Sequence, residues 1–385
     1  MDKGGGHHSA IIGERAPGRL LTSIYSEMTG SRFGISRQVH RVLGKLARKV
    51  SVTHCFGLPS YITIEITNAC ACTCRLCPVG QQRRSRRVGF ISWDQFTALV
   101  HSVRSHVKCL NLHNWGDPFL HPQIYQMISY AASEGIYVYA SSTLRDFNTC
   151  DAESLVRSKL NALTVSLHAA SEDSYRDYQP ARSRNDVTLV EALEKVKAIS
   201  SAKARLRSPF PCITLSSIVT RNNEHELPQF IRLANELGVR HSIWEASLNL
   251  RFLPYDRHMG RRDVDEATLR LERQSVVNGW LPKNNKHVNQ YYAYVRDHDG
   301  GLPPVVPKWF SCNAPWESVV ISSNGDVNLC CGSFSTSDSV GNVFDTPLRK
   351  IWNNDLYKAA RRNILGRSRP SDQNVQCREC PGALL

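Results

Sequence analysis

Three cysteines with short spacers indicate metal chemistry. Cys70, Cys74 and Cys77 follow directly on the alternating segment Tyr61–Thr67. A loop that leaves a strand can wrap three thiolates around one 4Fe–4S cluster, because short spacers keep the sulfurs on one side of a tight turn. Three ligands leave one iron open. An open iron can bind a small molecule and support chemistry, whereas a fully ligated cluster only stores or passes electrons.

A structural zinc site is the alternative for this loop. Such sites usually take four ligands from two pairs of Cys or His, and no such pair closes the set nearby. Cys72 lies inside the loop and could replace a neighbour as a ligand. The strand that precedes the loop favours the iron–sulfur interpretation.

The segment Ile64–Pro78, which contains the three cysteines, resembles the signature of the radical S-adenosylmethionine (SAM) superfamily. The resemblance implies that the open iron binds the amino and carboxylate groups of SAM, and that an electron from the cluster cleaves SAM to a 5′-deoxyadenosyl radical. It also implies an external electron donor such as flavodoxin or ferredoxin. Leu76 stands where the family usually has an aromatic residue near the adenine.

Composition predicts a soluble globular protein. The chain has 385 residues and an apolar fraction of 41%, enough for one large domain and a smaller one. Its 13 cysteines gather in ligand-like groups and no signal peptide is evident, which predicts a reducing, cytoplasmic compartment. No apolar run approaches the ~20 residues that span a bilayer.

The chain is basic, with 48 Lys and Arg against 34 Asp and Glu and a net charge of +14. Such an excess favours an anionic partner, for example a phosphate or a nucleotide-linked sugar. The densest basic run, residues 83–87, follows the cluster loop and either binds a phosphate near the substrate entrance or forms a solvated loop. No aromatic residue interrupts this run, so nucleic-acid binding is not expected.

From Leu58 onward, strand and helix patterns alternate, which predicts parallel βαβ units with right-handed crossovers. The predicted strands are Ile62–Thr67, Leu110–Asn114, Tyr137–Ser141, Leu163–His168, Ile213–Val219 and His241–Glu245. The predicted helices are Ser92–Val107, Gln123–Ser133, Val190–Ser200 and Leu227–Leu237, and Gly135 and Gly238 cap two of them. Six units make an α/β fold, a partial (β/α)6 TIM-like barrel like that of the resembling family, with its chemistry at the carboxyl ends of the strands.

Two strand ends resemble SAM-binding positions of the family. Asn114–Pro118 resembles the Gly-Gly-Glu-Pro turn whose backbone holds the SAM amino group, with Gly116 and Asp117 as the matching residues. The fourth predicted strand resembles the Val-Ser-Leu-Asp pattern, in which Ser166 takes the place of the serine that contacts SAM.

Two histidines lie at strand ends where they can reach a substrate. Period-two alternation puts Thr164, Ser166 and His168 on one face, which is the barrel lumen if Val165 and Leu167 pack against helices. His113 ends the second strand in the same way. Histidine suits proton transfer near neutral pH, so we expect at least one of the two to touch substrate; a hydrogen-bonded structural role is the alternative for each.

The N-terminal extension, residues 1–57, begins with the run Gly4–His8, which is typical of a disordered tail or a cloning remnant. A basic amphipathic helix follows. Its apolar residues are Val39, Val42, Leu43, Leu46 and Val50, and its basic residues are Arg37, Arg41, Lys45, Arg48 and Lys49. We expect the apolar stripe to dock onto the main domain, residues 58–250; a membrane-surface or partner-binding role is the alternative.

A second group of cysteines lies near the C-terminus, after an irregular connector over residues 251–307. Asn324-Gly325 between apolar runs predicts a hairpin, and residues 347–365 predict a helix. In the small α+β domain of residues 308–385, the candidate ligands are Cys312, Cys330, Cys377 and Cys380. Four thiols fit a fully ligated 4Fe–4S cluster or tetrahedral zinc equally well.

Residues 312–380 resemble the SPASM extension of radical SAM enzymes in its shortened "twitch" form, which implies one auxiliary 4Fe–4S cluster. The cysteine spacing resembles that of 2-deoxy-scyllo-inosamine dehydrogenase-like enzymes. Cys331 is left over. It is a buried small residue, a replacement ligand for Cys330, or a thiol that donates a hydrogen atom as in radical sugar epimerases.

These resemblances imply a radical SAM oxidoreductase or epimerase that abstracts hydrogen from a carbinol carbon of a sugar or aminocyclitol. The substrate is then small and polar, and the excess of basic residues favours an anionic one. A radical SAM peptide maturase is the first alternative, although residues 1–57 are too short and too helical for a winged peptide-recognition domain. A non-catalytic iron–sulfur electron carrier is the second alternative.

Overall fold

The computed structural model describes residues 33–81, 86–182, 187–245, 248, 265–302, 312–375 and 377. In the described part of the chain, no helix is long and apolar enough to cross a membrane. The predictions for Gly4–His8, for Arg83 to Ser85, for the boundary near Pro307 and for Cys380 concern residues outside this set.

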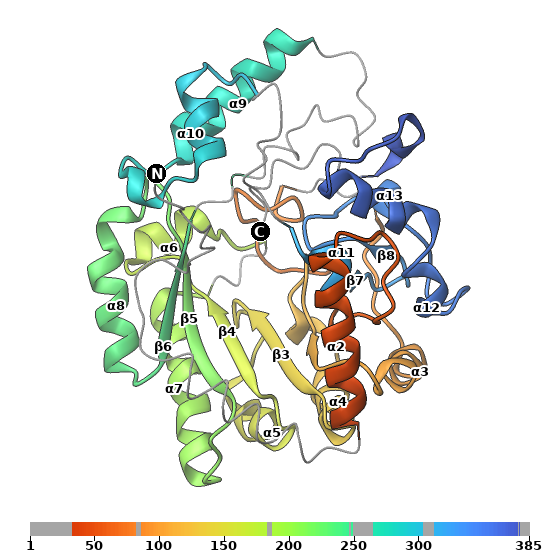
Figure 1. Cartoon of the computed structure of the whole chain (residues 1–385). Helices are drawn as coiled ribbons and strands as arrows, with labels where there is room; N and C mark the ends of the chain where they lie inside the picture. The colour runs from red at the N-terminus through yellow and green to blue at the C-terminus, as the bar shows by residue number, and fades with distance from the viewer. Residues whose placement is uncertain are drawn as a thin grey trace, which may run out of the picture.

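One open sheet organises the molecule (Figure 1). Its strands lie in the order β6-β5-β4-β3-β2-β1-β7-β8, and β1 to β7 pair in parallel while β8 is antiparallel to β7. The strands are β1 (Tyr61–Ile64), β2 (Cys109–Asn111), β3 (Tyr137–Ser142), β4 (Ala162–Ser166), β5 (Cys212–Ile218), β6 (Arg240–Trp244), β7 (Ser318–Ile321) and β8 (Val327–Asn328). All six predicted barrel strands are confirmed, and so is the hairpin at Asn324-Gly325, where Gly325 has a φ of +87°.

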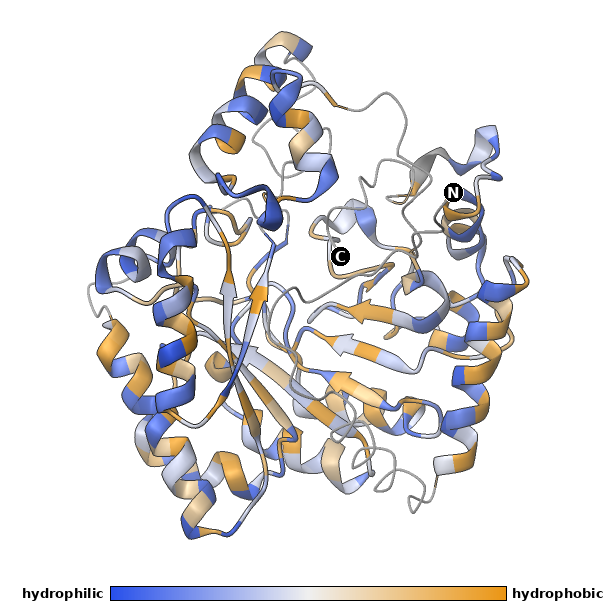
Figure 2. Ribbon diagram, turned by 60° about the vertical axis from the view of Figure 1, so that its left-hand side comes forward, coloured by the Kyte–Doolittle hydropathy of each residue, from blue (hydrophilic) through white to orange (hydrophobic). Residues whose placement is uncertain are grey.

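Amphipathic helices cover the outer face of the sheet (Figure 2). They are α3 (Trp93–Val103), α4 (Ile124–Ser133), α5 (Ala152–Arg157), α6 (Glu172–Tyr178), α7 (Leu189–Arg205) and α8 (Leu227–Glu236). Ser92 and Thr188 begin α3 and α7 with capping boxes, and Gly135 and Gly238 follow α4 and α8 with positive φ, as expected of C-caps. Short 3-10 turns are η1 (Pro118–Leu120), η2 (Thr149–Asp151), η3 (Glu224–Glu226), η6 (Asn285–His287), η7 (Thr336–Asp338) and η8 (Pro370–Asn374).

Alternation along the strands separates core from lumen. In β4, Leu163 and Val165 are fully buried beneath the helices, whereas Thr164 and Ser166 are only partly covered and face the lumen, as predicted. The carboxyl ends of β1 to β5 therefore collect the polar side chains that the barrel offers for chemistry.

The basic helix α2 (Gly34–Lys49) forms as predicted, but the prediction of its buried face is wrong. The fold buries Gly34, Arg37, Gly44 and Ala47, and leaves the apolar stripe exposed. Arg37 explains the reversal, because its guanidinium donates to the carbonyl oxygens of Arg104, Glu134 and Gly135, at the C-terminal ends of α3 and α4. These carbonyls have no partner within their own helices, and a cation satisfies them well.

Two further helical predictions need correction. The connector is not irregular in its described part: α9 (Glu266–Trp280) and α10 (Gln290–Asp297) pack together through Val277, Tyr292 and Val295. The C-terminal region contains α11 (Ala314–Glu317), α12 (Leu348–Ile351) and α13 (Asp355–Ile364). The single helix predicted over 347–365 is divided because the Asn354 side chain caps α13 by accepting from the Tyr357 N–H.

Candidate functional site

The loop with Cys70, Cys74 and Cys77 leaves β1 and is held by residues 178–182. Thr73 donates its backbone N–H to the Pro180 carbonyl at 2.7 Å, and Cys72 forms an antiparallel bridge with Ala181. Arg182 then donates to three carbonyl oxygens, which belong to Cys70, Cys72 and Val79. This arrangement fixes the loop without using any of the three cysteine sulfurs.

Close backbone packing also shapes this loop. A Cβ on Gly80 would lie 2.3 Å from the Cys74 carbonyl oxygen, so only glycine allows the chain to turn back at this point. Cys77 donates its N–H to the same carbonyl at 3.1 Å, which holds the second and third cysteines in one tight turn.

The donor set fits an iron–sulfur cluster. Cys72 lies within hydrogen-bond reach of the Cys70 and Cys74 side chains, and these contacts raise the pKa of both outer thiols, with burial adding to the effect. Burial raises the pKa of Cys77. Among the described residues, no three Cys, His, Asp or Glu side chains surround a single metal ion. Cysteine thiolates are the ligands of iron–sulfur clusters, so the three thiols of this loop fit such a cluster.

The turn with Gly116 and Asp117 packs against the start of the cluster loop. A Cβ on Gly116 would lie 2.2 Å from the Thr67 carbonyl oxygen, and Asp117 donates its N–H to the Ala69 carbonyl at 2.8 Å. The turn therefore lies beside the predicted cluster site, where its backbone could face a bound SAM.

The Asp117 carboxylate itself is occupied. It accepts hydrogen bonds from the Ser142 hydroxyl at 2.8 and 2.9 Å, and from the Thr143 N–H and hydroxyl, both at 3.0 Å. Burial raises the pKa of Asp117 to about 6, although these hydrogen bonds oppose the shift. Its side chain joins the turn to the end of β3.

Ser166 lies at the carboxyl end of β4 and faces the lumen. Its hydroxyl lies 3.1 Å from that of Ser141 at the end of β3. Its carbonyl accepts from the Gln179 side chain at 3.1 Å, which connects β4 to the segment that holds the cluster loop. The predicted SAM-contacting residue is thus placed next to the predicted cluster site.

His113 and His168 accept backbone hydrogen bonds from the neighbouring strands. The Ser141 N–H donates to Nδ1 of His113 at 2.9 Å, and the Ile218 N–H donates to Nδ1 of His168 at 3.0 Å. Burial lowers the pKa of each histidine to about 4. At neutral pH each ring is therefore uncharged, with its proton on Nε2, and its Nδ1 is not available as a base. This geometry supports the structural alternative for both residues.

In the C-terminal region, three of the four predicted ligands lie among the described residues. Cys312 is buried, and Cys330 and Cys377 are partly buried. Tyr357 lies near the last two: burial raises the pKa of its hydroxyl, and Cys377 and Cys330 raise it further. Cys330 and Cys377 therefore both act on the Tyr357 hydroxyl.

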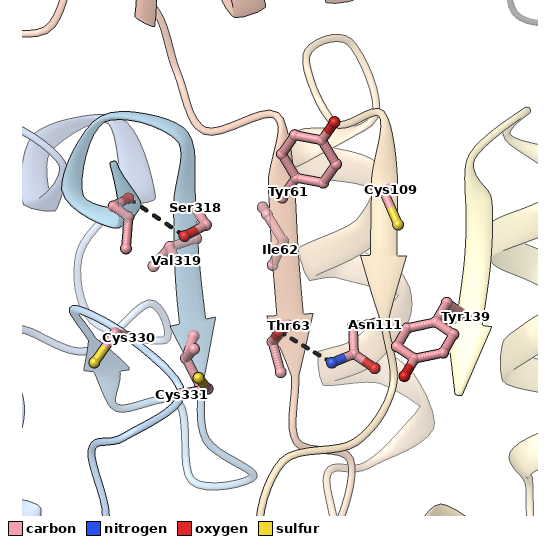
Figure 3. A pocket seen from close by; sticks show the side chains of 12 residues that line it. Tyr61, Ile62, Thr63, Cys109, Asn111, Tyr139, Ser318, Val319, Cys330 and Cys331 are labelled. Carbon is pink, nitrogen blue, oxygen red and sulfur yellow. Dashed lines mark hydrogen bonds between the residues drawn. The ribbon is translucent and has the colours of Figure 1, made fainter. Parts of the chain in front are cut away.

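A cavity of about 250 Å3 lies on the inner face of the sheet (Figure 3). Residues of β1, β2, β3 and β7 line it, together with Cys330 and Cys331. The hydroxyl of Thr63 accepts from Asn111 at 3.3 Å, and Tyr139 closes one side. Cys331 is exposed and belongs to this lining.

Sequence reasoning missed a buried ion pair between Glu65 and Arg86. Arg86 donates to both Glu65 oxygens, at 2.5 and 3.2 Å, and its Nε donates to the Phe334 carbonyl at 3.2 Å. Glu65 also accepts from the Trp115 N–H, while the Trp115 indole donates to the Ser333 carbonyl at 2.6 Å. In the sequence, the only indication of this ion pair was Glu65, an acidic residue within a strand pattern. Arg86, assigned to a solvated or phosphate-binding run, is in fact buried, whereas Arg87 is exposed.

This ion pair joins the two cysteine regions. Phe334 packs with Val79 and Trp115 beside Cys70 and Cys77. The segment that carries Cys330 and Cys331 therefore rests against the loop that carries the first cysteine triad.

Comparisons with known proteins match both regions. Residues 64–234 match the radical SAM superfamily, and residues 312–381 match SPASM, an iron–sulfur cluster-binding domain. The chain is 20% identical over 308 residues to the antilisterial bacteriocin subtilosin biosynthesis protein AlbA of Bacillus subtilis, covering 78% of this chain and 61% of AlbA. It is 22% identical to the PqqA peptide cyclase of Bradyrhizobium diazoefficiens, covering 64% of this chain and 63% of the cyclase.

Among solved structures, Streptococcus suis SuiB bound to the precursor peptide SuiA superposes with a TM-score of 0.53 at 13% identity, over 77% of this chain and 65% of SuiB. The chain spans about three fifths of the length of the curated relatives named above. The shared fold is the partial barrel with a C-terminal extension. The chain is therefore a radical SAM protein with a C-terminal SPASM domain, and its cofactors are SAM, the 4Fe–4S cluster that binds SAM, and auxiliary iron–sulfur clusters.

Proposed function

We propose that this protein is a radical SAM enzyme that modifies a peptide. The observation that carries the proposal is the alignment with AlbA and the PqqA peptide cyclase, a bacteriocin biosynthesis protein and a peptide cyclase, over 78% and 64% of this chain. The fold of SuiB, crystallised with a precursor peptide, adds support. The peptide alternative is therefore better supported than hydrogen abstraction from a sugar.

From the geometry we infer roles for residues of this chain. When bound, the cluster and SAM supply a one-electron cleavage that yields a strong hydrogen-atom abstractor. Arg182 and Gly80 hold the loop that would bind the cluster, and the backbone at Gly116 and Asp117 would hold SAM beside it. An external reductant such as flavodoxin or ferredoxin would supply the electron.

The cavity limits what can enter the lumen. Its volume of about 250 Å3 is smaller than the roughly 300–1,000 Å3 of pockets that enclose a whole drug-sized ligand. It has room for one side chain of a peptide whose backbone stays outside. If the rest of the peptide stays outside, only the side chain that carries the reacting carbon enters the lumen.

A sugar or aminocyclitol is the second candidate substrate. Four lining side chains carry groups that can bind a polar ring, namely the Tyr61, Thr63 and Tyr139 hydroxyls and the Asn111 amide. On this candidate, oxidation gives a ketone, and hydrogen return from Cys331 would give an epimer.

Anaerobic reconstitution tests the proposal. With dithionite and SAM, the protein should release 5′-deoxyadenosine, and a peptide encoded beside its gene should lose about two mass units per bond formed by hydrogen abstraction. Deuterium at the reacting carbon should appear in 5′-deoxyadenosine if abstraction is direct. Turnover of an aminosugar with every neighbouring peptide unchanged would assign the second candidate instead, and absence of 5′-deoxyadenosine would refute both.

A further inference from the structure

Helix α2 presents an apolar stripe to solvent along its whole length. Its five members share one face of the helix, at spacings of three and four residues. They and their exposed fractions are Ile35 85%, Val39 49%, Val42 59%, Leu46 50% and Val50 57%. Burial of apolar surface is the main stabilising contribution to folding, so a continuous exposed stripe of this length indicates a contact outside the fold.

The fold holds α2 by its opposite face. Arg37 caps α3 and α4, and Arg48 lies over the Trp316 ring at 5.0 Å. Gly44 allows close approach to α11, since a Cβ there would lie 2.7 Å from the Trp316 carbonyl oxygen. Figure 1 shows α2 beside α11 and β7 at the edge of the molecule. The stripe is therefore not needed to place the helix.

The charge of α2 selects among possible occupants. The helix carries five basic residues and no acidic one. Lys45 and Lys49 are exposed and border the stripe beside Val42 and Leu46. An occupant must therefore accept apolar side chains and carry negative charge next to them.

A second copy of the chain fits these requirements poorly. Pairing two α2 helices would add the positive charges of both copies at one interface, and like charges oppose association. A helix of 16 residues is about 24 Å long and about 10 Å wide, so its face covers roughly a third of the area that each partner of a stable dimer buries.

An anionic lipid surface fits them well. Helices that lie in the membrane interface combine an apolar face with flanking Lys and Arg, and each cation near an anionic leaflet adds to binding. On the other side of the stripe, Gly57 lies against Leu43. Phe56, which precedes Gly57, is 73% exposed and adds an aromatic side chain there.

We propose that α2 docks the protein on anionic membrane surfaces through its apolar stripe, with Lys45 and Lys49 at the headgroups. This docking is independent of the substrate proposed above, because the stripe lies on the outside of the fold and the predicted cluster site at the carboxyl ends of the strands. It would bring the enzyme to a membrane without a spanning segment.

Vesicle flotation of the full chain tests this proposal. The protein should float with vesicles that contain about 30% phosphatidylglycerol and remain unbound with pure phosphatidylcholine, and high salt should weaken the binding. The double variant Val42→Glu/Leu46→Glu should bind at least about tenfold more weakly, because carboxylates oppose both insertion and the anionic surface. Leu271→Glu is the matched control: Leu271 is 73% exposed on α9, and its variant should bind like the wild type.

Other outcomes would overturn the proposal. Wild-type protein that binds neither vesicle, or stripe variants that bind as well as the wild type, would exclude a lipid surface. A two-chain mass in light scattering that falls to one chain in the double variant would assign the stripe to a second copy. If the thiol of the variant Val42→Cys resists alkylation in the lipid-free monomer, the result would assign the stripe to residues 1–32. Unchanged thermal unfolding of the double variant checks that the fold is intact.

Discussion

At the carboxyl ends of β2 and β4, the rings of two histidines accept backbone hydrogen bonds. His168 has a φ of +58°, a left-handed conformation that lets both its backbone N–H and its ring reach β5. His113 makes the equivalent contact to β3. Each ring takes the place of a strand carbonyl where the parallel ladder ends, so both residues extend the sheet.

Replacing His168 with Gln should therefore preserve turnover. The Gln side-chain oxygen can accept the Ile218 N–H, and activity should stay within about threefold, whereas loss of a general base costs about 10²–10⁴-fold. The pH profile of turnover should also be unchanged. A fall of a hundredfold or more in a folded variant would show that His168 transfers a proton.

The same variant should change the pH dependence of stability. Burial lowers the pKa of His168 from 6.5 to about 4 in the folded protein. Between these values the unfolded chain binds more protons, so the stabilisation is complete above pH 6.5 and is lost as the pH falls toward 4, by roughly 1.4 kcal/mol per unit. Urea unfolding at pH 7 and pH 5 should show a smaller difference for His168→Gln than for the wild type.

Iron content should distinguish the adjacent thiols Cys330 and Cys331. Because Cys330 and Cys377 both lie near Tyr357, Cys330→Ala should reduce the iron of the reconstituted protein from about eight to about four atoms per chain. Cys331→Ala should leave it near eight. The reverse pattern would make Cys331 the ligand, and about four irons in the wild type would mean that the C-terminal site holds zinc or nothing.

Local sequence correctly placed the cysteine triad and the Gly116 turn in loops that follow strands, whereas their roles toward a cluster and SAM stay predictions. The partners of His113 and His168 were not predictable, because each lies on another strand. The same holds for Asp117, whose carboxylate contacts residues at positions 142 and 143.

Among the helices, α2 shows how one side chain can determine the orientation of an element. Hydrophobic periodicity correctly predicted that α2 is amphipathic, but periodicity does not say which face is buried. Arg37 decides this, because it satisfies three carbonyls at the ends of two helices. The strands of the barrel were predictable because each is buried on one face and bounded by loop residues.

Arg37→Met should destabilise the fold by about 2 to 4 kcal/mol, since the helix-end carbonyls lose a charged donor in a buried setting. Arg37→Lys should recover part of the loss, because one ammonium cannot reach all three carbonyls. Arg41→Met, on the same helix, should change the free energy of unfolding little. Urea unfolding measures all three, and equal stability of Arg37→Met and Arg41→Met would contradict this role.

In the molecule as a whole, the SPASM region extends the barrel instead of standing apart from it. β7 pairs in parallel with β1, in register from Tyr61–Ser318 to Ile64–Ile321. The hairpin was predictable from Asn324-Gly325, but its pairing with a strand more than 250 residues earlier was not, because no local pattern records such a partner. Two cysteine regions that are distant in sequence thus share one sheet.

The Glu65–Arg86 pair should couple these regions in both stability and reaction. Arg86→Met leaves the fully buried Glu65 carboxylate without its cation and should cost about 3–5 kcal/mol, whereas Glu65→Leu/Arg86→Met should recover part of this loss.

Because Arg86 also holds the Phe334 carbonyl, its loss should displace the Cys330 segment from the first cysteine loop. Arg86→Met should then still cleave SAM but release more 5′-deoxyadenosine per product, whereas Arg87→Met, at an exposed position, should match the wild type. Non-additive stabilities with an unchanged ratio of 5′-deoxyadenosine to product would show that the pair only supports the fold, whereas additive stabilities would show that Glu65 and Arg86 are not coupled.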